Sequence, residues 1–289
     1  MKMKDIFNLP SNPLTKYFGF NNQLNHEREV LTFDEYHTDL SFEDIVNNRC
    51  KKIKEVCNNK KIILLLSGGL DSTMIYYAFK NNNLDFKIFM TDMTEVEHYN
   101  LYHEVINSDK EYEVFDSKDF LSILKNFQDK NTVFISGDLG DQIFLSNLTY
   151  NHFYDIRHLP YRMIVPIDVI KYTESKVNKV LKNNINATIA NWCWAIDFIY
   201  RWNFIVDLFK DEIEKDVITF FDDIEFEKYS VTNQIKNSRY NRFTNKQDIR
   251  DYILKYSNDL EYVTYKTKIG SQRMFFRPEE FKKDYNKHL

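Results

Sequence analysis

A run of five aliphatic residues followed at once by two glycines is the feature that most constrains how this chain folds. The run extends from Ile62 to Leu66 without a polar residue, which is typical of a strand buried on both faces. Residues 72–79 lack glycine and proline and space their apolar side chains as a helix does. Between the two lie Ser67, Gly68, Gly69, Leu70 and Asp71. The pattern therefore predicts a buried strand, a tight glycine turn and a helix.

The predicted turn has the properties of an anion-binding site. The first backbone N–H groups of a helix lack intrahelical partners, and the helix dipole places partial positive charge there. Gly68 and Gly69 allow the backbone to approach a phosphate closely, and the hydroxyls of Ser67 and Ser72 can donate hydrogen bonds. The loop contains no lysine and matches neither the Walker nor the dinucleotide pattern. Because the carboxylate of Asp71 would repel a phosphate, the loop predicts a nucleotide bound together with a hard cation such as Mg²⁺.

At these residues the chain resembles the PP-loop enzymes, whose signature SGGxDS follows an apolar strand. Members of that family cleave ATP between its α and β phosphates and activate a substrate as an adenylate. The signature reads SGGLDS here. The resemblance implies that ATP binds over this loop, and it places these residues at the nucleotide: Leu66, Ser67, Gly68, Gly69, Asp71, Ser72, Met90 and Gly137.

A second strand and glycine turn carries the next motif. Residues 133–135 are predicted to form a strand, and the sequence SGDLGDQIF follows from Ser136. This motif resembles the second motif of asparagine synthetase and β-lactam synthetase. The resemblance implies that Asp71 and Asp141 hold Mg²⁺ on the pyrophosphate and that Asp138 is an active-site carboxylate. Leu139 and Gln142 depart from the family, which has a small residue and usually Glu at these positions.

The remaining pattern predicts the fold class. A helix is expected from Ser41, which with Asp44 forms a capping box, and its apolar face would include Val56. Helices are further expected at 96–106 and 117–127, and strands at 86–90 and 112–115. Strands that alternate with helices in this way predict an α/β fold with a parallel sheet covered on both faces. Residues 187–209 are apolar nearly all round and predict a buried helix or pair of helices within a helical C-terminal part.

A basic loop near the end of the chain completes the resemblance. Residues 251–255 resemble a helix that precedes this loop in the family, and residues 265–270 resemble the loop itself. The family carries there a lysine that contacts phosphates and stabilises charge during condensation. Lys268 is the first choice for this catalytic role and Lys266 the second. A fixed ammonium would offset the negative charge that pyrophosphate departure concentrates.

Composition excludes several classes of protein. The net charge of −4 provides no overall attraction to nucleic acid or to anionic lipid, so neither is expected as a partner. The odd number of cysteines, three, argues against a complete disulfide framework, and no segment is apolar enough to span a membrane. A cytoplasmic location is therefore expected. His98 and His103 lie five residues apart and do not align on one helix face, so we interpret them as core or surface residues, not as metal ligands.

The resemblance covers approximately residues 55–280. It implies that a small-molecule carboxylate is adenylated by ATP and Mg²⁺ with release of pyrophosphate, and that an amine or ammonia then forms an amide. Residues 1–54 are expected to form an N-terminal segment without a glutaminase domain, and residues 55–289 the synthetase-like domain. Nitrogen would then come from free ammonia, a second substrate, or a separate glutaminase or ammonia-donating subunit. A homo-oligomer is compatible with the sequence.

Two other functions fit the same motifs. A PP-loop enzyme that modifies a nucleobase or tRNA would adenylate a carbonyl oxygen and would need a basic groove with aromatic residues. A nucleotide-binding regulator without turnover would result if Gln142 had disabled the metal site.

Overall fold

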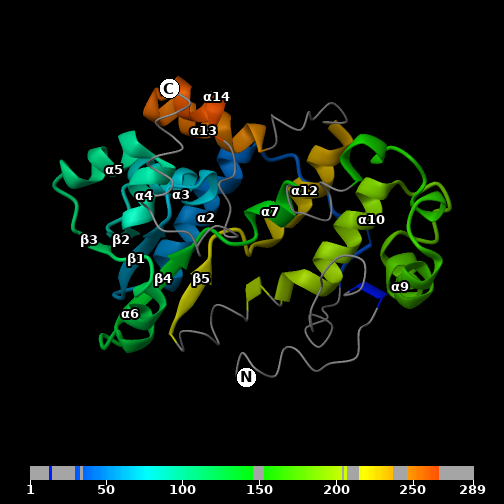
Figure 1. The fold of residues 1–289 in the computed structure, drawn as a ribbon, viewed down its shortest axis with the longest axis horizontal. Coiled ribbons are helices and arrows are strands. Elements are labelled where there is room, and N and C mark those ends of the chain that lie inside the picture. Colours follow the sequence, from blue (N-terminus) through cyan, green and yellow to red (C-terminus); the bar gives the residue numbers. More distant parts are fainter. Residues whose placement is uncertain are drawn as a thin grey trace. The chain divides into compact units, whose positions relative to one another are not determined.

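The structure is a computed structural model that describes residues 13–14, 30–32, 35–145, 153–203, 205–206, 215–236 and 246–266 (Figure 1). The chain divides into two compact units. One is helical and comprises Met1–Asp39, Leu139–Leu208 and Ile224–Asn245. The other contains the sheet and comprises Leu40–Asp138, Phe209–Asp223 and Lys246–Leu289. In the part of the chain that the structure describes, no helix combines the length and the apolar character that crossing a membrane requires.

The helical unit is built around buried aromatic side chains. Its elements are α7 (Gly140–Ile143), η4 (Tyr154–Ile156), η5 (Tyr161–Met163), α9 (Ile167–Val180), α10 (Ile189–Ile196), the π-helical η6 (Asp197–Arg201) and α12 (Ile224–Lys236). Trp194 stacks on Phe198 with ring centroids 4.4 Å apart, and its indole N–H donates to Ser230 Oγ at 2.8 Å. Both rings are fully buried. The prediction of a buried helical region within 187–209 is therefore confirmed for the residues that the structure describes.

The second unit has an α/β fold, as the sequence predicts. Its elements are α2 (Phe42–Val56), β1 (Lys61–Leu66), α3 (Leu70–Asn81), β2 (Lys87–Thr91), α4 (Asp92–Glu97), α5 (Tyr99–Ile106), β3 (Tyr112–Phe115), α6 (Phe120–Asn126), β4 (Thr132–Ser136), β5 (Val217–Thr219), α13 (Gln247–Ser257) and α14 (Leu260–Tyr265). The strands form one parallel sheet in the order β3-β2-β1-β4-β5. All but the first residue of β1 is buried, as expected for the central strand.

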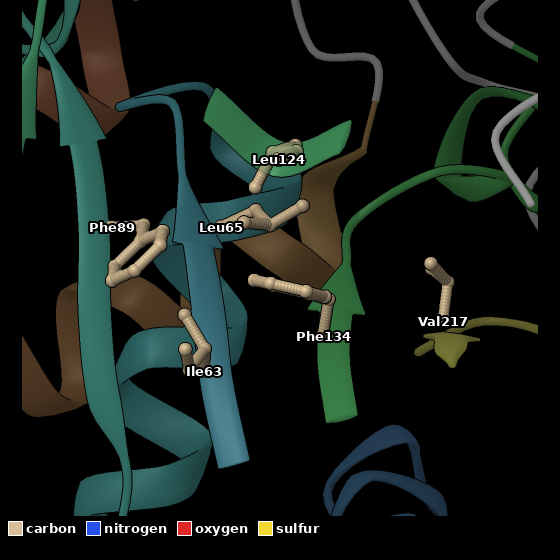
Figure 2. Close-up of a cluster of buried hydrophobic side chains, with 6 residues drawn as sticks. All are labelled: Ile63, Leu65, Phe89, Leu124, Phe134 and Val217. Carbon is tan, nitrogen blue, oxygen red and sulfur yellow. The ribbon is translucent and has the colours of Figure 1, made fainter. Parts of the chain in front are cut away.

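One face of the sheet carries an apolar cluster that α6 covers. Successive side chains of a strand point to opposite faces, so Ile63 and Leu65 of β1 share this face. They pack with Phe89, Phe134 and Val217 from the other strands and with Leu124 of α6 (Figure 2). The opposite face is covered by α3, against which α2 and α13 pack. The helix that begins at the glycine turn is thus held firmly between the sheet and two further helices.

Local details differ from the sequence expectations in several places. The helix expected at 117–127 covers only Phe120–Asn126. The helix expected at 96–106 is broken at His98, whose φ of −153° ends α4 and begins α5. Val56, expected on the apolar face of α2, is 72% exposed because it lies in the last turn of that helix. The strand β5 was not expected, since its three residues are too few to show a period. The Ser41–Asp44 capping box of α2 is confirmed.

Candidate active site

Both glycine motifs lie at the topological switch point of the sheet. The chain leaves β1 toward β2 on one side, whereas β4 pairs with β1 on the other side and leads to β5. All strands are parallel, so the carboxyl ends of β1 and β4 are neighbours at the same edge. Ligands of open parallel sheets bind in the crevice at such a point. The fold therefore places Ser67 and Gly137, the first residues after β1 and β4, where a ligand is expected.

The loop after β1 is held by its two serine hydroxyls. Ser67 Oγ lies 3.0 Å from Ser72 Oγ, and Ser72 Oγ donates to the Gly69 carbonyl at 3.2 Å. The backbone N–H of Ser67 also donates to Ser72 Oγ, at 3.2 Å. Gly69 is the N-cap residue of α3, and no side chain caps this helix end. The N-terminus of a twelve-residue helix thus presents its partial positive charge at the loop without a capping hydrogen bond from the side chain of its N-cap residue.

The fold restricts the two glycine positions of this loop to different degrees. Gly68 has φ +76°, and a Cβ there would lie 2.9 Å from Glu97 Cβ and 3.0 Å from the Thr94 carbonyl oxygen. The fold itself therefore excludes a side chain at Gly68. Gly69 has φ −74°, and a Cβ there would meet only Ser67 Oγ, at 3.4 Å, which is an ordinary contact. Nothing in the described part of the chain requires glycine at position 69.

The second motif reaches the first through Gly137. A Cβ at Gly137 would lie 3.2 Å from Asp71 Cβ and 3.2 Å from the backbone nitrogen of Ser72. The backbone after β4 therefore passes directly over the first turn of α3, and glycine is what permits this approach. Ser136, the last residue of β4, is 3% exposed, and its Oγ makes no hydrogen bond to any described residue. Ser136 was not among the predicted site residues.

Asp71 is paired with Lys246. Lys246 Nζ lies 2.7 Å from Asp71 Oδ1 and 2.5 Å from Oδ2, and the lysine side chain is 6% exposed against 24% for the aspartate. Lys246 precedes α13, which packs on α3, and its own backbone is left-handed with φ +60°. The predicted metal ligand thus has a buried ammonium beside it. No sequence signal pointed to Lys246, because 175 positions separate the two residues.

Side chains from α4 and α14 pack against the loop and donate hydrogen bonds to its backbone. Thr94 Oγ1 donates to the Leu66 carbonyl at 2.9 Å, and the Tyr262 hydroxyl donates to the Gly68 carbonyl at 2.9 Å. The His98 ring stacks on the Tyr262 ring with centroids 3.4 Å apart and an interplanar angle of 4°. Burial lowers the pKa of His98 to about 4, although Asp259, which lies 3.3 Å from His98 Nε2, acts in the opposite direction. His98 is therefore neutral at pH 7.

Lys266, the second choice for the catalytic lysine, is bound to Glu97 of α4. Its Nζ donates to the Glu97 carbonyl at 2.7 Å and to the Glu97 carboxylate, and its side chain is 7% exposed. Burial lowers the pKa of Lys266, while the carboxylate of Glu97 raises it. Lys266 thus binds the C-terminal end of α4. Lys268, the first choice, lies outside the described residues.

The remaining predicted site residues lie at strand ends or on α7. Leu66 and Met90 are 2% and 0% exposed, so their side chains belong to the core. Asp138 is the last residue of the segment Leu40–Asp138, which contains β4 and belongs to the unit with the sheet. Asp141 lies on α7 of the helical unit. A magnesium ion shared by Asp71 and Asp141 remains a prediction. Among the described residues, no three His, Cys, Asp or Glu side chains gather into a metal-binding group.

Leu139 takes an unusual backbone conformation. Its φ of +73° is in the left-handed region, although its side chain is 2% exposed. Leucine is strained in this conformation, which a glycine would adopt freely. The neighbouring Gln142 is 3% exposed, and its backbone N–H donates to the Leu139 carbonyl at 2.9 Å. The turn between the two motif carboxylates is thus formed with a leucine in a strained position.

Comparison with known proteins adds one relative. No protein-family model matches the chain. The Microcin J25-processing protein McjC of Escherichia coli is 31% identical over 111 residues, which are 38% of this chain. The matched part is 20% of McjC, so the chain spans about a fifth of the length of this curated relative. Over those 111 residues the chain is similar to a protein that processes a microcin.

Proposed function

We propose that this chain is an ATP-dependent ligase of the asparagine synthetase type, which activates a carboxylate and joins it to an amine or to ammonia. The observation that carries the proposal is the backbone contact between the two glycine motifs, in which Gly137 lies against Asp71 and Ser72. Two loops that follow neighbouring strands are thereby brought to the uncapped N-terminus of α3. This arrangement suits the phosphates of a nucleotide.

The residues present fit ATP bound with Mg²⁺. Gly69 is not needed by the fold, but a Cβ there would stand between the backbone and a phosphate at the helix end. The buried hydroxyl of Ser136 lacks a protein partner among the described residues, as a ligand-binding donor does before its ligand arrives. Asp71 and Asp141 would hold the Mg²⁺, which supplies positive charge to the phosphate oxygens.

The chain's own residues would share the work as follows. The first N–H groups of α3 would donate to phosphate oxygens, and the hydroxyls of Ser67 and Ser72 would do so after giving up their present hydrogen bonds to each other and to the Gly69 carbonyl. Lys246 places an ammonium beside Asp71, so its charge lies close to the departing pyrophosphate. Asp138 would lie toward the acceptor substrate, and Lys268 would stabilise charge in the condensation step.

The reaction then has two parts. A carboxylate oxygen of the substrate attacks the α-phosphorus of ATP, the bond to the β-phosphate breaks, and pyrophosphate leaves. The nitrogen of an amine or of ammonia next attacks the acyl carbon, AMP leaves with one oxygen of the former carboxylate, and the nitrogen loses a proton. Because McjC processes a microcin, peptides with a free carboxylate belong among the substrates to be tested beside small acids.

The test is a screen for carboxylate-dependent pyrophosphate release. The full chain is incubated with ATP, Mg²⁺, an amine donor and carboxylates labelled with ¹⁸O, and AMP is analysed by mass spectrometry. The proposal expects pyrophosphate and AMP that carries one ¹⁸O atom. The variant Gly69→Ala serves as the matched control without turnover. Formation of ADP and phosphate would contradict the proposal, and pyrophosphate release that requires RNA would support the nucleobase-modifying alternative.

A further inference from the structure

The hydroxyl of Tyr262 is bound to the backbone of the phosphate loop. Tyr262 lies on α14 near the end of the chain, 194 positions from Gly68, and is 8% exposed. Its hydroxyl donates to the Gly68 carbonyl at 2.9 Å and lies 3.3 Å from Thr73 Oγ1. Since the tyrosine proton is given to the carbonyl, the Thr73 hydroxyl is left to donate to the tyrosine oxygen. The two hydroxyls therefore form a short chain that ends on the loop.

This hydrogen bond fixes the orientation of one peptide group. The peptide between Gly68 and Gly69 is trans, so its C=O and its N–H point in opposite directions. With the Gly68 carbonyl held by Tyr262, the Gly69 N–H must point away from α14. Among the described residues, that N–H donates to Ser67 Oγ at 3.3 Å, which is a long bond for an amide donor. A glycine pair could otherwise rotate this peptide at little cost.

The tyrosine ring is itself held in place. The His98 ring stacks on it, and the Asp259 carboxylate accepts from the backbone N–H of Tyr262 at 2.9 Å. Burial raises the pKa of the Tyr262 hydroxyl, so it stays protonated and remains a donor over the physiological range. The ring therefore has no freedom to release the Gly68 carbonyl without moving α14.

We infer that Tyr262 is a positioning residue, which presents the Gly69 N–H to a phosphate of the nucleotide by holding the Gly68 carbonyl. The inference rests on the proposed function, because it assumes that a phosphate binds at this loop. Tyr262 does not touch the reacting atoms in this role. It acts through the Gly68–Gly69 peptide alone.

The test is the variant Tyr262→Phe, which removes the hydroxyl and keeps the stacked ring. The probe is α,β-methylene-ATP with Mg²⁺, whose bridging bond the enzyme cannot cleave. One lost hydrogen bond predicts a dissociation constant raised about tenfold. The control is Tyr252→Phe on α13, a buried tyrosine whose hydroxyl makes no hydrogen bond to the loop, and its affinity should stay within about twofold of the wild type.

A spectroscopic signal separates positioning from a general loss of structure. The chain has six glycines, so ¹⁵N-glycine labelling gives a simple amide spectrum in which Gly69→Ala identifies the Gly69 peak. In the wild type the probe should shift this peak, and in Tyr262→Phe the peak should change before the probe is added and shift less afterwards. Thr73→Val, which leaves the ring untouched, should produce a smaller change of the same kind.

The two possible failures are distinct. If the wild type does not bind the probe, the proposed function is wrong and this inference is overturned with it. If the wild type binds and Tyr262→Phe gives the same affinity and the same Gly69 shift, the positioning role alone is wrong. Should Tyr262→Phe fail to fold, equal binding by the wild type and Thr73→Val would overturn the inference.

Discussion

Lys246 Nζ contacts both carboxylate oxygens of Asp71, at 2.7 Å and 2.5 Å, and thereby joins the residue before α13 to the first turn of α3. The lysine is almost completely buried, whereas the aspartate is about a quarter exposed. The free energy lost on breaking the pair therefore depends on which of the two residues is replaced. Removing the charge beside a buried ammonium costs more free energy than removing the charge beside a carboxylate that water can reach.

This asymmetry predicts a distinctive double-mutant cycle. Asp71→Asn removes the carboxylate that the buried ammonium of Lys246 contacts and should lower the free energy of unfolding by about 2–4 kcal/mol. Lys246→Met leaves a carboxylate that water can solvate and should lower it by about 1 kcal/mol. The double variant removes both charges, so its loss should be smaller than the sum by about 1–3 kcal/mol. Urea unfolding measures all four proteins.

Pyrophosphate release by these variants should not change in parallel with their stability. Under the proposed function Asp71 holds Mg²⁺, so the double variant should regain stability while pyrophosphate release stays at background. A double variant that recovers both properties would mean that Asp71 only anchors Lys246. Additive losses of stability would mean that the ion pair contributes nothing measurable.

The two glycines of the phosphate loop should respond oppositely to alanine. At Gly68 the left-handed backbone and the close Glu97 and Thr94 atoms predict a loss of about 2–4 kcal/mol in the free energy of unfolding. At Gly69 the backbone is extended and the contact is ordinary, so stability should change by less than about 1 kcal/mol. Gly69→Ala should nevertheless weaken binding of an ATP analogue at least about tenfold, because its Cβ would meet the phosphate. Unchanged affinity in this folded variant would argue against a phosphate at the loop.

The sequence predicted those parts of the fold that local patterns encode. The aliphatic run 62–66, the glycine turn and the capping box at Ser41 each depend on neighbouring residues, and all three are confirmed. The alternation of strands and helices was sufficient for the parallel sheet. The strand β5 was missed because three residues carry no period, and its pairing with β4 depends on packing between distant segments.

The site was predictable only where it lies on contiguous residues. The phosphate loop and the second motif are short and local, and the structure brings Gly137 of the second against Asp71 of the first. Lys246 and Tyr262 reach the same loop from positions more than 170 residues away, so no spacing rule could connect them with it. His98 was interpreted as a core or surface residue. Its burial is confirmed, but its stacking on Tyr262 depends on the tertiary fold.

His98 predicts a specific loss of stability in mild acid. Its pKa is about 4 in the folded chain and 6.5 as a free group, so between these values the unfolded chain binds more protons. Stability is therefore intact above pH 6.5 and falls as the pH drops toward 4, by at most about 3 kcal/mol from this residue. Urea unfolding at intervals from pH 8 to pH 5 measures the slope in a range above the usual titration of carboxylates.

The source of that slope can be assigned with two glutamine variants. His98→Gln removes the titrating ring and should flatten the slope between pH 6.5 and 5, although the loss of stacking on Tyr262 lowers stability throughout. His37→Gln makes the same change at an exposed histidine and serves as the matched control. An unchanged slope in His98→Gln would show that another group governs the acid response.

Leu139 predicts a reversal of the usual ranking of alanine and glycine. Both substitutions empty a buried site, and Leu139→Ala should lower the free energy of unfolding by about 2–5 kcal/mol. Alanine keeps the strain of φ +73°, whereas glycine relieves it, so Leu139→Gly should be more stable than Leu139→Ala by about 1 kcal/mol. Leu101, fully buried within α5, is the control, because there glycine should be less stable than alanine by about 1 kcal/mol.

This reversal bears on why a leucine can occupy position 139. A small residue at position 139 would adopt the left-handed turn without strain, whereas leucine accepts about 1 kcal/mol of strain and gains more than that from burial. The turn should then keep its shape in Leu139→Gly, and pyrophosphate release per folded molecule should equal that of the wild type. If Leu139→Gly proves less stable than Leu139→Ala, the backbone at 139 is not left-handed in solution, and this account of the leucine is wrong.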